Sequence, residues 1–435
     1  MDRFALEKLK QWKEKKNRKP LIIRGARQVG KTWLMKEFGR TCFKKMAYVN
    51  FDSNTRMRQV FEGDINIERL ILAISAETGV SIDSRDTLLI FDEVQEVPKA
   101  LTALKYFCEE ASEYAIVAAG SLLGVAMHKG TSFPVGKVDF MDLYPLSFRE
   151  FLCALGEMRF AEILDSSDTD MVTMFKSKYI DRLREYYFVG GMPEVVQSYL
   201  DSKDFNQVRE IQKNLLNDYQ QDFSKHAEAT LVSRLNLVWN SIPMQLAKEN
   251  KKYIYGHVRE GARAKDFELA IQWLMDCGLI HKVQRIKKPG LPLKAYLDLD
   301  AFKIYLLDIG LLMAMVDLDA RVIIDGNRIF TEFKGALTEQ YVLQQLIADL
   351  GIEAYYYSTE KSSGEIDFLL QGKSSILPLE VKAEENLRAK SLKAFCEKYH
   401  PACAVRTSMS DYREQEWMTN IPLYNICRIK KYLDQ

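Results

Sequence analysis

Residues 21–32 read LIIRGARQVGKT, in which a short apolar run leads directly into the pattern G-x-x-x-x-G-K-T. The apolar run predicts a buried strand, and the two glycines that follow it let the backbone wrap closely around a polyphosphate. Lys31 places an ammonium against the outer phosphates, and Thr32 offers a hydroxyl to the accompanying magnesium ion. A helix that begins near Lys31 adds the positive end of its dipole. We therefore expect nucleotide phosphates to bind at eight consecutive residues: Gly25, Ala26, Arg27, Gln28, Val29, Gly30, Lys31 and Thr32.

Two further apolar runs end in polar residues, as expected of neighbouring strands in a parallel sheet. Residues 87–93 read TLLIFDE, which predicts a buried strand that delivers two carboxylates at its end. Asp92 would hold the magnesium ion, and Glu93 would orient and polarise the attacking water. Residues 114–120 read YAIVAAG and precede Ser121. The Ser121 hydroxyl either senses the γ-phosphate or lytic water, or caps the next helix.

Helical segments such as 33–38 and 100–110 alternate with these strands, which predicts a doubly wound parallel sheet with its ligand at the strand ends. The adjacent Asp and Glu favour an AAA-type ATPase over a small GTPase, and the chain lacks the guanine-reading pattern N-K-x-D. An additional cation commonly stabilises the transition state of phosphoryl transfer. Lys137 and Arg149 are candidates for it, although Arg149 has the alternative of pairing with a nearby acid.

The composition places the chain among ordinary globular proteins of several domains. Apolar residues make up 47% and charged residues 28% of 435, and the formal net charge is +1. Contact with nucleic acid or an anionic membrane would therefore depend on local patches. The seven scattered cysteines lack C-x-x-C spacing, which predicts reduced thiols and no zinc site. With no signal-peptide pattern and no apolar stretch long enough to span a bilayer, we expect a cytoplasmic protein without a membrane segment.

The middle of the chain contains two segments with different sequence patterns. Residues 151–225 have helical periodicity and contain the turn GGMPE at 190–194, which suggests a helical lid after the ATPase core. From about residue 264 the order is helix, strand, a basic turn at 285–290 and a returning strand at 294–299. This is the order of a winged helix, whose basic turn would contact a phosphate backbone. The alternative is a small interdomain module with a solvated hairpin.

The last hundred or so residues carry a second set of candidate site residues. Asp367 lies in the run GEIDFLL, and Glu380 and Lys382 lie in ILPLEVK. Residues two apart on a strand share a face, so Glu380 and Lys382 point into the same site. The spacing matches a restriction-endonuclease-like core: Asp367 and Glu380 would hold a divalent metal, and Glu339 on the preceding helix would supply a third carboxylate. Lys382 would stabilise the attacking hydroxide and the developing phosphorane charge.

Taken together, the chain resembles a large family of bacterial and archaeal AAA-type ATPases that are fused to a C-terminal domain of unknown function with a nuclease-like core. Family members often have arginine where this chain has Lys137, which weakens a finger role for that residue. The resemblance covers essentially the whole chain. It is carried by the segments RGARQVGKT (24–32), IFDEVQ (90–95), AGSLLG (119–124), YPLSFREF (144–151), GGMPEV (190–195), EIDFLL (365–370) and LEVK (379–382).

We therefore predict an α/β protein that binds and hydrolyses ATP with Mg²⁺ and whose nucleotide state controls the C-terminal domain. One alternative is a non-catalytic, ATP-bound scaffold for a protein partner, and another is a nuclease that ATP licenses and Mg²⁺ or Mn²⁺ activates. DNA, a protein and a second copy of the chain all remain open as partners. The predicted domains are an ATPase core (1–150), a helical lid (151–225), a winged-helix-like module (226–300) and a restriction-endonuclease-like domain (301–435).

Overall fold

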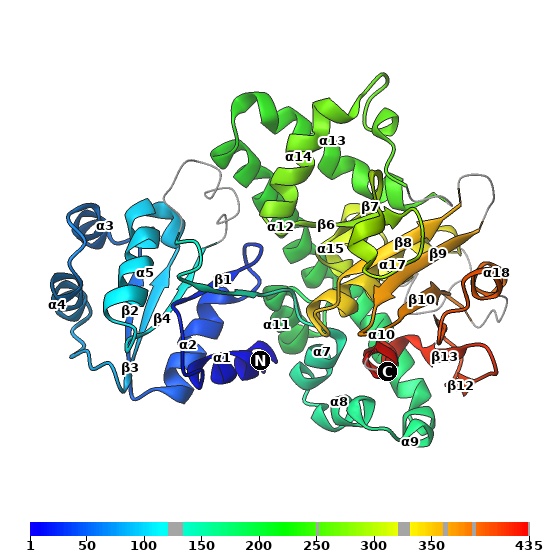
Figure 1. Cartoon of the computed structure of the whole chain (residues 1–435), viewed down its shortest axis with the longest axis horizontal. Coiled ribbons are helices and arrows are strands. Elements are labelled where there is room, and N and C mark those ends of the chain that lie inside the picture. Colours follow the sequence, from blue (N-terminus) through cyan, green and yellow to red (C-terminus); the bar gives the residue numbers. More distant parts are fainter. Residues whose placement is uncertain (121–133, 249–251, 321–330, 360–363, 385–388, 434–435) are drawn as a thin grey trace. The chain divides into compact units, whose positions relative to one another are not determined.

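The computed structural model describes residues 1–120, 134–248, 252–320, 331–359, 364–384 and 389–433. The chain divides into two compact units, each built around one sheet (Figure 1). The N-terminal unit comprises Asp2–Tyr144 together with the short segment Asp276–Leu279. The C-terminal unit comprises Pro145–Met275 and Ile280–Gln435, with Met1.

The sheet of the N-terminal unit has five strands in the order β2-β3-β4-β1-β5, and every neighbouring pair is parallel. The predicted α/β fold with a parallel sheet is thus confirmed. β4 lies between β1, which leads into the P-loop, and β3, which ends in Asp92, so the two predicted halves of the nucleotide site are separated by one strand. The strands are β1 (Leu21–Arg24), β2 (Lys45–Asn50), β3 (Thr87–Asp92), β4 (Ala115–Ala119) and β5 (Asp139–Asp142).

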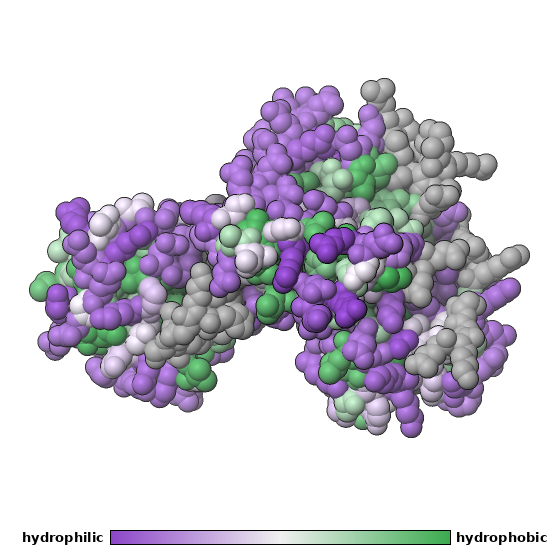
Figure 2. Space-filling model, turned by 90° about the horizontal axis from the view of Figure 1, so that it is seen from above, coloured by the Kyte–Doolittle hydropathy of each residue, from purple (hydrophilic) through white to green (hydrophobic). Residues whose placement is uncertain are grey.

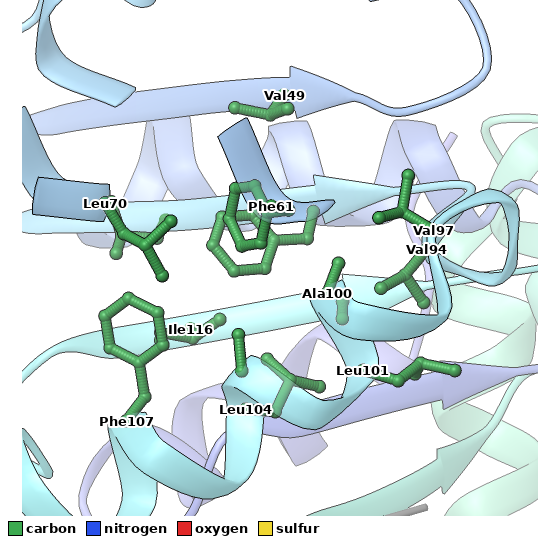
Figure 3. Close-up of a cluster of buried hydrophobic side chains, with 14 of the residues drawn as sticks. Val49, Phe61, Leu70, Val94, Val97, Ala100, Leu101, Leu104, Phe107 and Ile116 are labelled. Carbon is green, nitrogen blue, oxygen red and sulfur yellow. The ribbon is translucent and has the colours of Figure 1, made fainter. Parts of the chain in front are cut away.

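Helices cover both faces of this sheet, which explains why β3 is apolar on both sides and completely buried. α1 and α2 pack on one face, and α3, α4 and α5 enclose a hydrophobic cluster on the other. Figure 3 shows Phe61 and Leu70 from these helices close to Val49 and Ile116 of the sheet. The helices are α1 (Ala5–Lys13), α2 (Lys31–Cys42), α3 (Thr55–Glu62), α4 (Ile67–Thr78) and α5 (Pro98–Glu110), with a 3₁₀ turn η1 (Val94–Glu96).

The sheet of the C-terminal unit has eight strands in the order β12-β13-β11-β10-β9-β8-β6-β7 and is mixed. β9 and β10, which carry the predicted second site, are antiparallel neighbours near its centre. The strands are β6 (Ile280–Ile286), β7 (Leu297–Leu306), β8 (Ala354–Ser358), β9 (Glu365–Gln371), β10 (Ile376–Val381), β11 (Val405–Ser408), β12 (Arg413–Glu414) and β13 (Thr419–Pro422).

Most of the helices in this unit come from the middle of the chain. They are α7 (Phe148–Ala154), α8 (Met158–Asp165), α9 (Thr169–Met174), α10 (Lys176–Val189), α11 (Pro193–Ser202), α12 (Phe205–His226), α13 (Ala229–Leu246), α14 (Ala264–Asp276), α15 (Ile309–Met315), α17 (Thr331–Ala348), α18 (Lys390–Tyr399) and α19 (Lys430–Leu433). Short 3₁₀ helices are η2 (Tyr255–His257), η3 (Leu293–Tyr296) and η5 (Leu423–Ile429).

The structure differs from the sequence prediction for residues 151–225. These residues are helical as expected, but α7–α12 belong to the compact unit of the C-terminal sheet and are not a separate lid on the ATPase core. Buried polar contacts explain the grouping, because Gln344 of α17 donates to the Tyr186 hydroxyl of α10 at 3.0 Å. Gln345 accepts from the backbone N–H of Phe148 at 2.7 Å. Such satisfied buried groups join the helices to α17 specifically.

The segment predicted to form a winged helix is also arranged differently in the structure. Helix α14, β6 and β7 follow in the expected order, but β6 also pairs with β8, where Arg285 lies opposite Tyr356. The hairpin is therefore part of the eight-stranded sheet, and the boundary expected after residue 300 falls inside β7. Backbone pairing between Arg285 and Tyr356, which are 71 residues apart in sequence, is not visible in the local pattern that suggested a wing.

The surface is mostly hydrophilic, as the ordinary composition of the chain predicts. On the face drawn in Figure 2, hydrophilic residues predominate and hydrophobic residues appear in separate, smaller areas. Every helix in the described part of the chain is too short or too polar to cross a bilayer.

Candidate nucleotide site and C-terminal carboxylate cluster

The P-loop connects β1 to α2 in the predicted manner. Its backbone has positive φ at Gly25 (147°), Gln28 (65°) and Gly30 (93°), and Gly30 is the N-cap of α2. Alternation of left-handed and ordinary residues turns successive N–H groups toward one concave side, which suits an anion. Only glycine fits at position 25, because a Cβ there would lie 2.2 Å from the carbonyl oxygen of Leu143.

Lys31, the first residue of α2, is buried against this loop. Its Nζ donates to the carbonyl oxygens of Gly25 (2.9 Å) and Ala26 (2.7 Å). Burial lowers the pKa of Lys31 to about 8, against the opposing influence of Glu93 and Asp92. The ammonium is thus held at the loop where the phosphates are expected. Because its pKa is about 8, it loses its proton at mildly alkaline pH.

The two side chains predicted to serve magnesium lie in direct contact. Thr32 Oγ1 donates to Asp92 Oδ2 at 2.7 Å, which joins the start of α2 to the end of β3. Asp92 is only 2% exposed. A hydroxyl and a carboxylate oxygen at this separation are the hard oxygen ligands that Mg²⁺ prefers, alongside waters and phosphate oxygens. The residues present therefore fit the ion that the P-loop implies.

Tyr48 of β2 belongs to this site, although the sequence analysis did not identify it. Its hydroxyl donates to the same Asp92 Oδ2 at 2.9 Å, and Asn50 donates to that hydroxyl at 3.3 Å. Burial raises the pKa of Tyr48 to about 12, so it remains a donor. The signal was available in the alternation of β2, which places Tyr48 and Asn50 on one side of a strand next to β3.

Glu93 follows Asp92 in a left-handed conformation, with φ 51°. Its N–H donates to Asp92 Oδ1 at 3.1 Å, and its Oε2 accepts from Gln95 Nε2 at 2.7 Å. The backbone turn therefore keeps the carboxylate of the expected water-activating residue at the end of the sheet. Gln95 is a second residue that the sequence analysis missed. Ser121 lies outside the described residues.

Arg3, which lies just before α1, forms hydrogen bonds that hold the P-loop in place. Its guanidinium donates to the carbonyl oxygens of Val29 (3.0 Å) and Tyr144 (2.6 Å), and the residue is 7% exposed. Charge-assisted bonds of this kind fix the far side of the loop. No local sequence signal marks Arg3, because its partners are remote along the chain.

Lys137 and Arg149 were the candidates for the additional cation in phosphoryl transfer. Within one chain, the contacts of these two residues do not support that role. Lys137 precedes β5, whose first residue pairs with Leu21 at the start of β1, so Lys137 lies at the opposite end of the sheet from the P-loop. It pairs there with Glu109 at 2.8 Å. Arg149 forms a bidentate ion pair with Asp349 at 2.6 and 2.8 Å. Pairing with a nearby acid is the alternative that the sequence suggested for this residue.

In the C-terminal unit, the structure brings the predicted residues of the second site together. Lys382 Nζ lies 2.7 Å from Glu380 Oε1, and the N–H of Val381 donates to Asp367 Oδ2 at 2.7 Å. Burial lowers the pKa of Lys382, but Glu380, Asp367 and Glu339 outweigh it and raise the pKa above its ordinary value. These residues therefore lie close together, as their spacing predicts.

The divalent-metal site predicted at Glu339, Asp367 and Glu380 stays a prediction. Among the residues that the structure describes, no three His, Cys, Asp or Glu side chains are grouped closely enough to hold a metal. Glu339 instead accepts from the Tyr305 hydroxyl at 3.0 Å and lies 3.7 Å from Nζ of Lys303. Lys303 also contacts Glu365. A buried lysine, which the sequence analysis missed, thus lies beside Glu339, one of the carboxylates that were expected to bind the ion.

The basic turn predicted to contact DNA is partly neutralised. Arg285 lies inside β6 and pairs with the buried Asp298 of β7, with Nε to Oδ2 at 2.8 Å. Lys287 lies 3.8 Å from the other oxygen of Asp298. These contacts hold the hairpin together and leave less positive charge for a phosphate backbone than the sequence suggested.

Three family models match separate parts of the chain. Residues 17–152 match a model described as an AAA domain. This part of the chain is similar to AAA domains. Residues 180–322 match a domain of unknown function (DUF8612), and residues 334–426 match another (DUF4143). The latter two matches leave the activity of the C-terminal unit unassigned.

Solved structures that match the chain include a Walker-type ATPase of Pyrococcus abyssi, at 14% identity and a TM-score of 0.44, covering 72% of this chain and 95% of that one. The Orc1 protein of Aeropyrum pernix in complex with DNA matches at 12% identity and a TM-score of 0.27, covering 72% and 90%. The fold of the N-terminal unit follows from its strand order and its P-loop. No curated protein matches the sequence.

Proposed function

We propose that the AAA domain binds ATP with Mg²⁺ and hydrolyses it. The observation that carries the proposal is the contact of Thr32 with Asp92 at 2.7 Å, directly beside the P-loop lysine and followed by Glu93. When bound, the ion would neutralise charge on the phosphates and help to position them. ATP is proposed over GTP because the chain has no N-K-x-D pattern.

Each residue has a defined part in this proposal. The P-loop N–H groups and Lys31 hold the phosphates, while Thr32 and Asp92 hold the ion. Tyr48 keeps Asp92 oriented through its donated hydrogen bond. Glu93 accepts a proton from the attacking water or orients it, and Gln95 holds the Glu93 carboxylate until then.

The test is magnesium-dependent release of phosphate from ATP, measured for the wild type and for Glu93→Gln over a range of protein concentrations. Loss of a general base predicts a fall in kcat of about 10²-fold or more with ATP binding retained. Lys31→Met should lose binding itself. Wild-type protein that binds ATP without turnover would support a scaffold instead, and wild-type protein that binds no nucleotide would refute the proposal.

We further propose that the nucleotide state controls the C-terminal unit. The support is the path of the chain, because Asp276–Leu279 belong to the N-terminal unit while the residues on both sides belong to the other. The test is hydrogen exchange of residues 280–433 with ADP, with a non-hydrolysable ATP analogue and without nucleotide. Lys31→Met is the matched control. Identical exchange in all three states of the wild type would contradict the coupling.

A further inference from the structure

Gly278 lies in the short segment Asp276–Leu279, which belongs to the N-terminal unit although the chain on both sides of it belongs to the other unit. The segment joins the end of α14 to the start of β6, and the backbone of Gly278 is left-handed, with φ 71°. A Cβ at this position would lie 3.1 Å from the backbone nitrogen of Ala26 and 3.6 Å from the carbonyl carbon of Gly25. The turn therefore packs directly against the peptide group that joins Gly25 to Ala26 in the P-loop.

The same peptide group is held by the P-loop lysine. Lys31 Nζ donates to the carbonyl oxygen of Gly25 at 2.9 Å and to that of Ala26 at 2.7 Å. Because this ammonium is also the group expected to contact the outer phosphates, ATP binding would draw it away from these two oxygens. The peptide group would then lose a charge-assisted hydrogen bond that fixes its orientation. Gly278 is thus placed where it would meet any movement of this peptide group.

The other passage of the chain between the two units also lies against the P-loop. The chain leaves the N-terminal unit after Tyr144, and the N–H of the preceding Leu143 donates to the carbonyl oxygen of Arg24 at 2.8 Å. Arg3 donates to the carbonyl oxygens of both Val29 and Tyr144. These hydrogen bonds attach residues 143–144 to both ends of the loop. At residues 143–144 and at residues 276–279, the chain that leads into the C-terminal unit is therefore in contact with the nucleotide site.

We infer that Gly278 is a positioning residue of the nucleotide site, and that it passes the state of that site to α14 and β6, which continue the chain on either side of it. The inference rests on the proposed binding of ATP, and it names the residue through which the proposed control of the C-terminal unit acts. With ATP bound, Lys31 turns from the Gly25–Ala26 peptide group to the phosphates, and that peptide group and Gly278 shift together. Coupling between two sites acts in both directions, so a change at Gly278 alters the affinity for ATP.

The substitution Gly278→Ala tests the inference, with Gly79→Ala as the matched control. Both glycines lie just after a helix and have left-handed backbones, with φ 71° and 68°. Both variants therefore bear a similar cost for placing a Cβ in that conformation. The two positions differ in their surroundings, because a Cβ at position 278 meets the P-loop, whereas a Cβ at position 79 has no atom of the described residues within 4 Å.

Two measurements on the full chain are needed. Titration with a non-hydrolysable ATP analogue gives the Kd, and hydrogen exchange of residues 280–433 with and without saturating analogue gives the response of the C-terminal unit. Gly278→Ala should weaken the Kd about tenfold, because the P-loop must shift to make room for the Cβ, and it should reduce the difference in exchange. Gly79→Ala should keep the wild-type Kd and difference, although both variants lose thermal stability to a similar extent. A purely structural role of Gly278 would lower thermal stability alone.

Several outcomes would overturn the inference and leave the proposed function standing. They are a Gly278→Ala variant with the wild-type Kd, a Gly278→Ala variant with the full difference in exchange, and a Gly79→Ala variant whose Kd is weakened as much. If Gly278→Ala does not fold, the wild type decides, because exchange at residues 276–279 should change when the analogue binds and unchanged exchange there refutes the inference. A wild type that binds no nucleotide would instead refute the proposed function, and the inference with it.

Discussion

The pKa of Lys31 makes ATP binding sensitive to mild alkalinity. In the empty site burial lowers this pKa to about 8, so the ammonium is present below that pH and is lost above it. Bound phosphates restore the charge, so binding above pH 8 includes the uptake of a proton. At about pH 9 only about a tenth of the empty sites carry the charge, and the Kd for ATP should be about tenfold weaker than at about pH 7.5, a change of about 1.4 kcal/mol.

The same group affects stability in the opposite direction. Because the pKa in the folded protein lies below the ordinary value of 10.5, the unfolded chain binds a proton that the folded chain does not between about pH 8 and 10.5. The contribution of Lys31 to the free energy of unfolding of the empty protein therefore rises with pH in that window. ATP affinity falls over the same range, so the two measurements have opposite slopes.

The assay is calorimetric titration with a non-hydrolysable ATP analogue at several pH values between about 7.5 and 9.5, at constant Mg²⁺ and ionic strength. Lys31→Arg is the matched control, because a guanidinium keeps its charge throughout and should give a flat profile. A wild-type Kd that does not change up to about pH 9.5 would refute the reasoning, since it would mean that Lys31 keeps an ordinary pKa. The same slope in Lys31→Arg would assign the effect to another group.

Three substitutions test the P-loop, the Asp92 contact and the Arg149–Asp349 ion pair. Gly25→Ala should abolish nucleotide binding, measured by titration, because the added Cβ would lie 2.2 Å from a backbone oxygen and φ is 147°; retained affinity would contradict the loop geometry. Tyr48→Phe removes one hydrogen bond to the Asp92 carboxylate, so the Mg²⁺ concentration that gives half-maximal hydrolysis should rise about tenfold or more; an unchanged Mg²⁺ dependence would exclude a positioning role. Arg149→Met leaves Asp349 buried without its cation and should lower the free energy of unfolding by about 3–5 kcal/mol. ATP turnover per folded molecule should stay unchanged, and a large loss of kcat would restore Arg149 as a candidate finger.

The sequence predicted the features that depend on neighbouring residues. The P-loop is eight consecutive residues whose glycines, lysine and threonine act through local backbone geometry, and β1, β3 and β4 are apolar runs that only a buried strand explains. Asp92 and Glu93 were found because they end one of these runs. Helical periodicity also identified α7–α12, although not the unit to which they belong.

The remaining features depend on partners far apart in the chain, and these only the tertiary structure decided. The strand order brings Tyr48 to Asp92, and the fold brings Arg3 to Val29. In the C-terminal unit, the spacing of Asp367 and Glu380 suggested a metal site, but no local pattern pointed to Lys303, which enters from β7 and lies 3.7 Å from Glu339. The pattern of one segment shows which of its side chains share a face. The oppositely charged partners of those side chains come from other strands, and only the tertiary structure shows which strands these are. The sequence therefore determined where a nucleotide would bind, and the tertiary structure decided that Lys303 of β7 contacts Glu365 and lies 3.7 Å from Glu339.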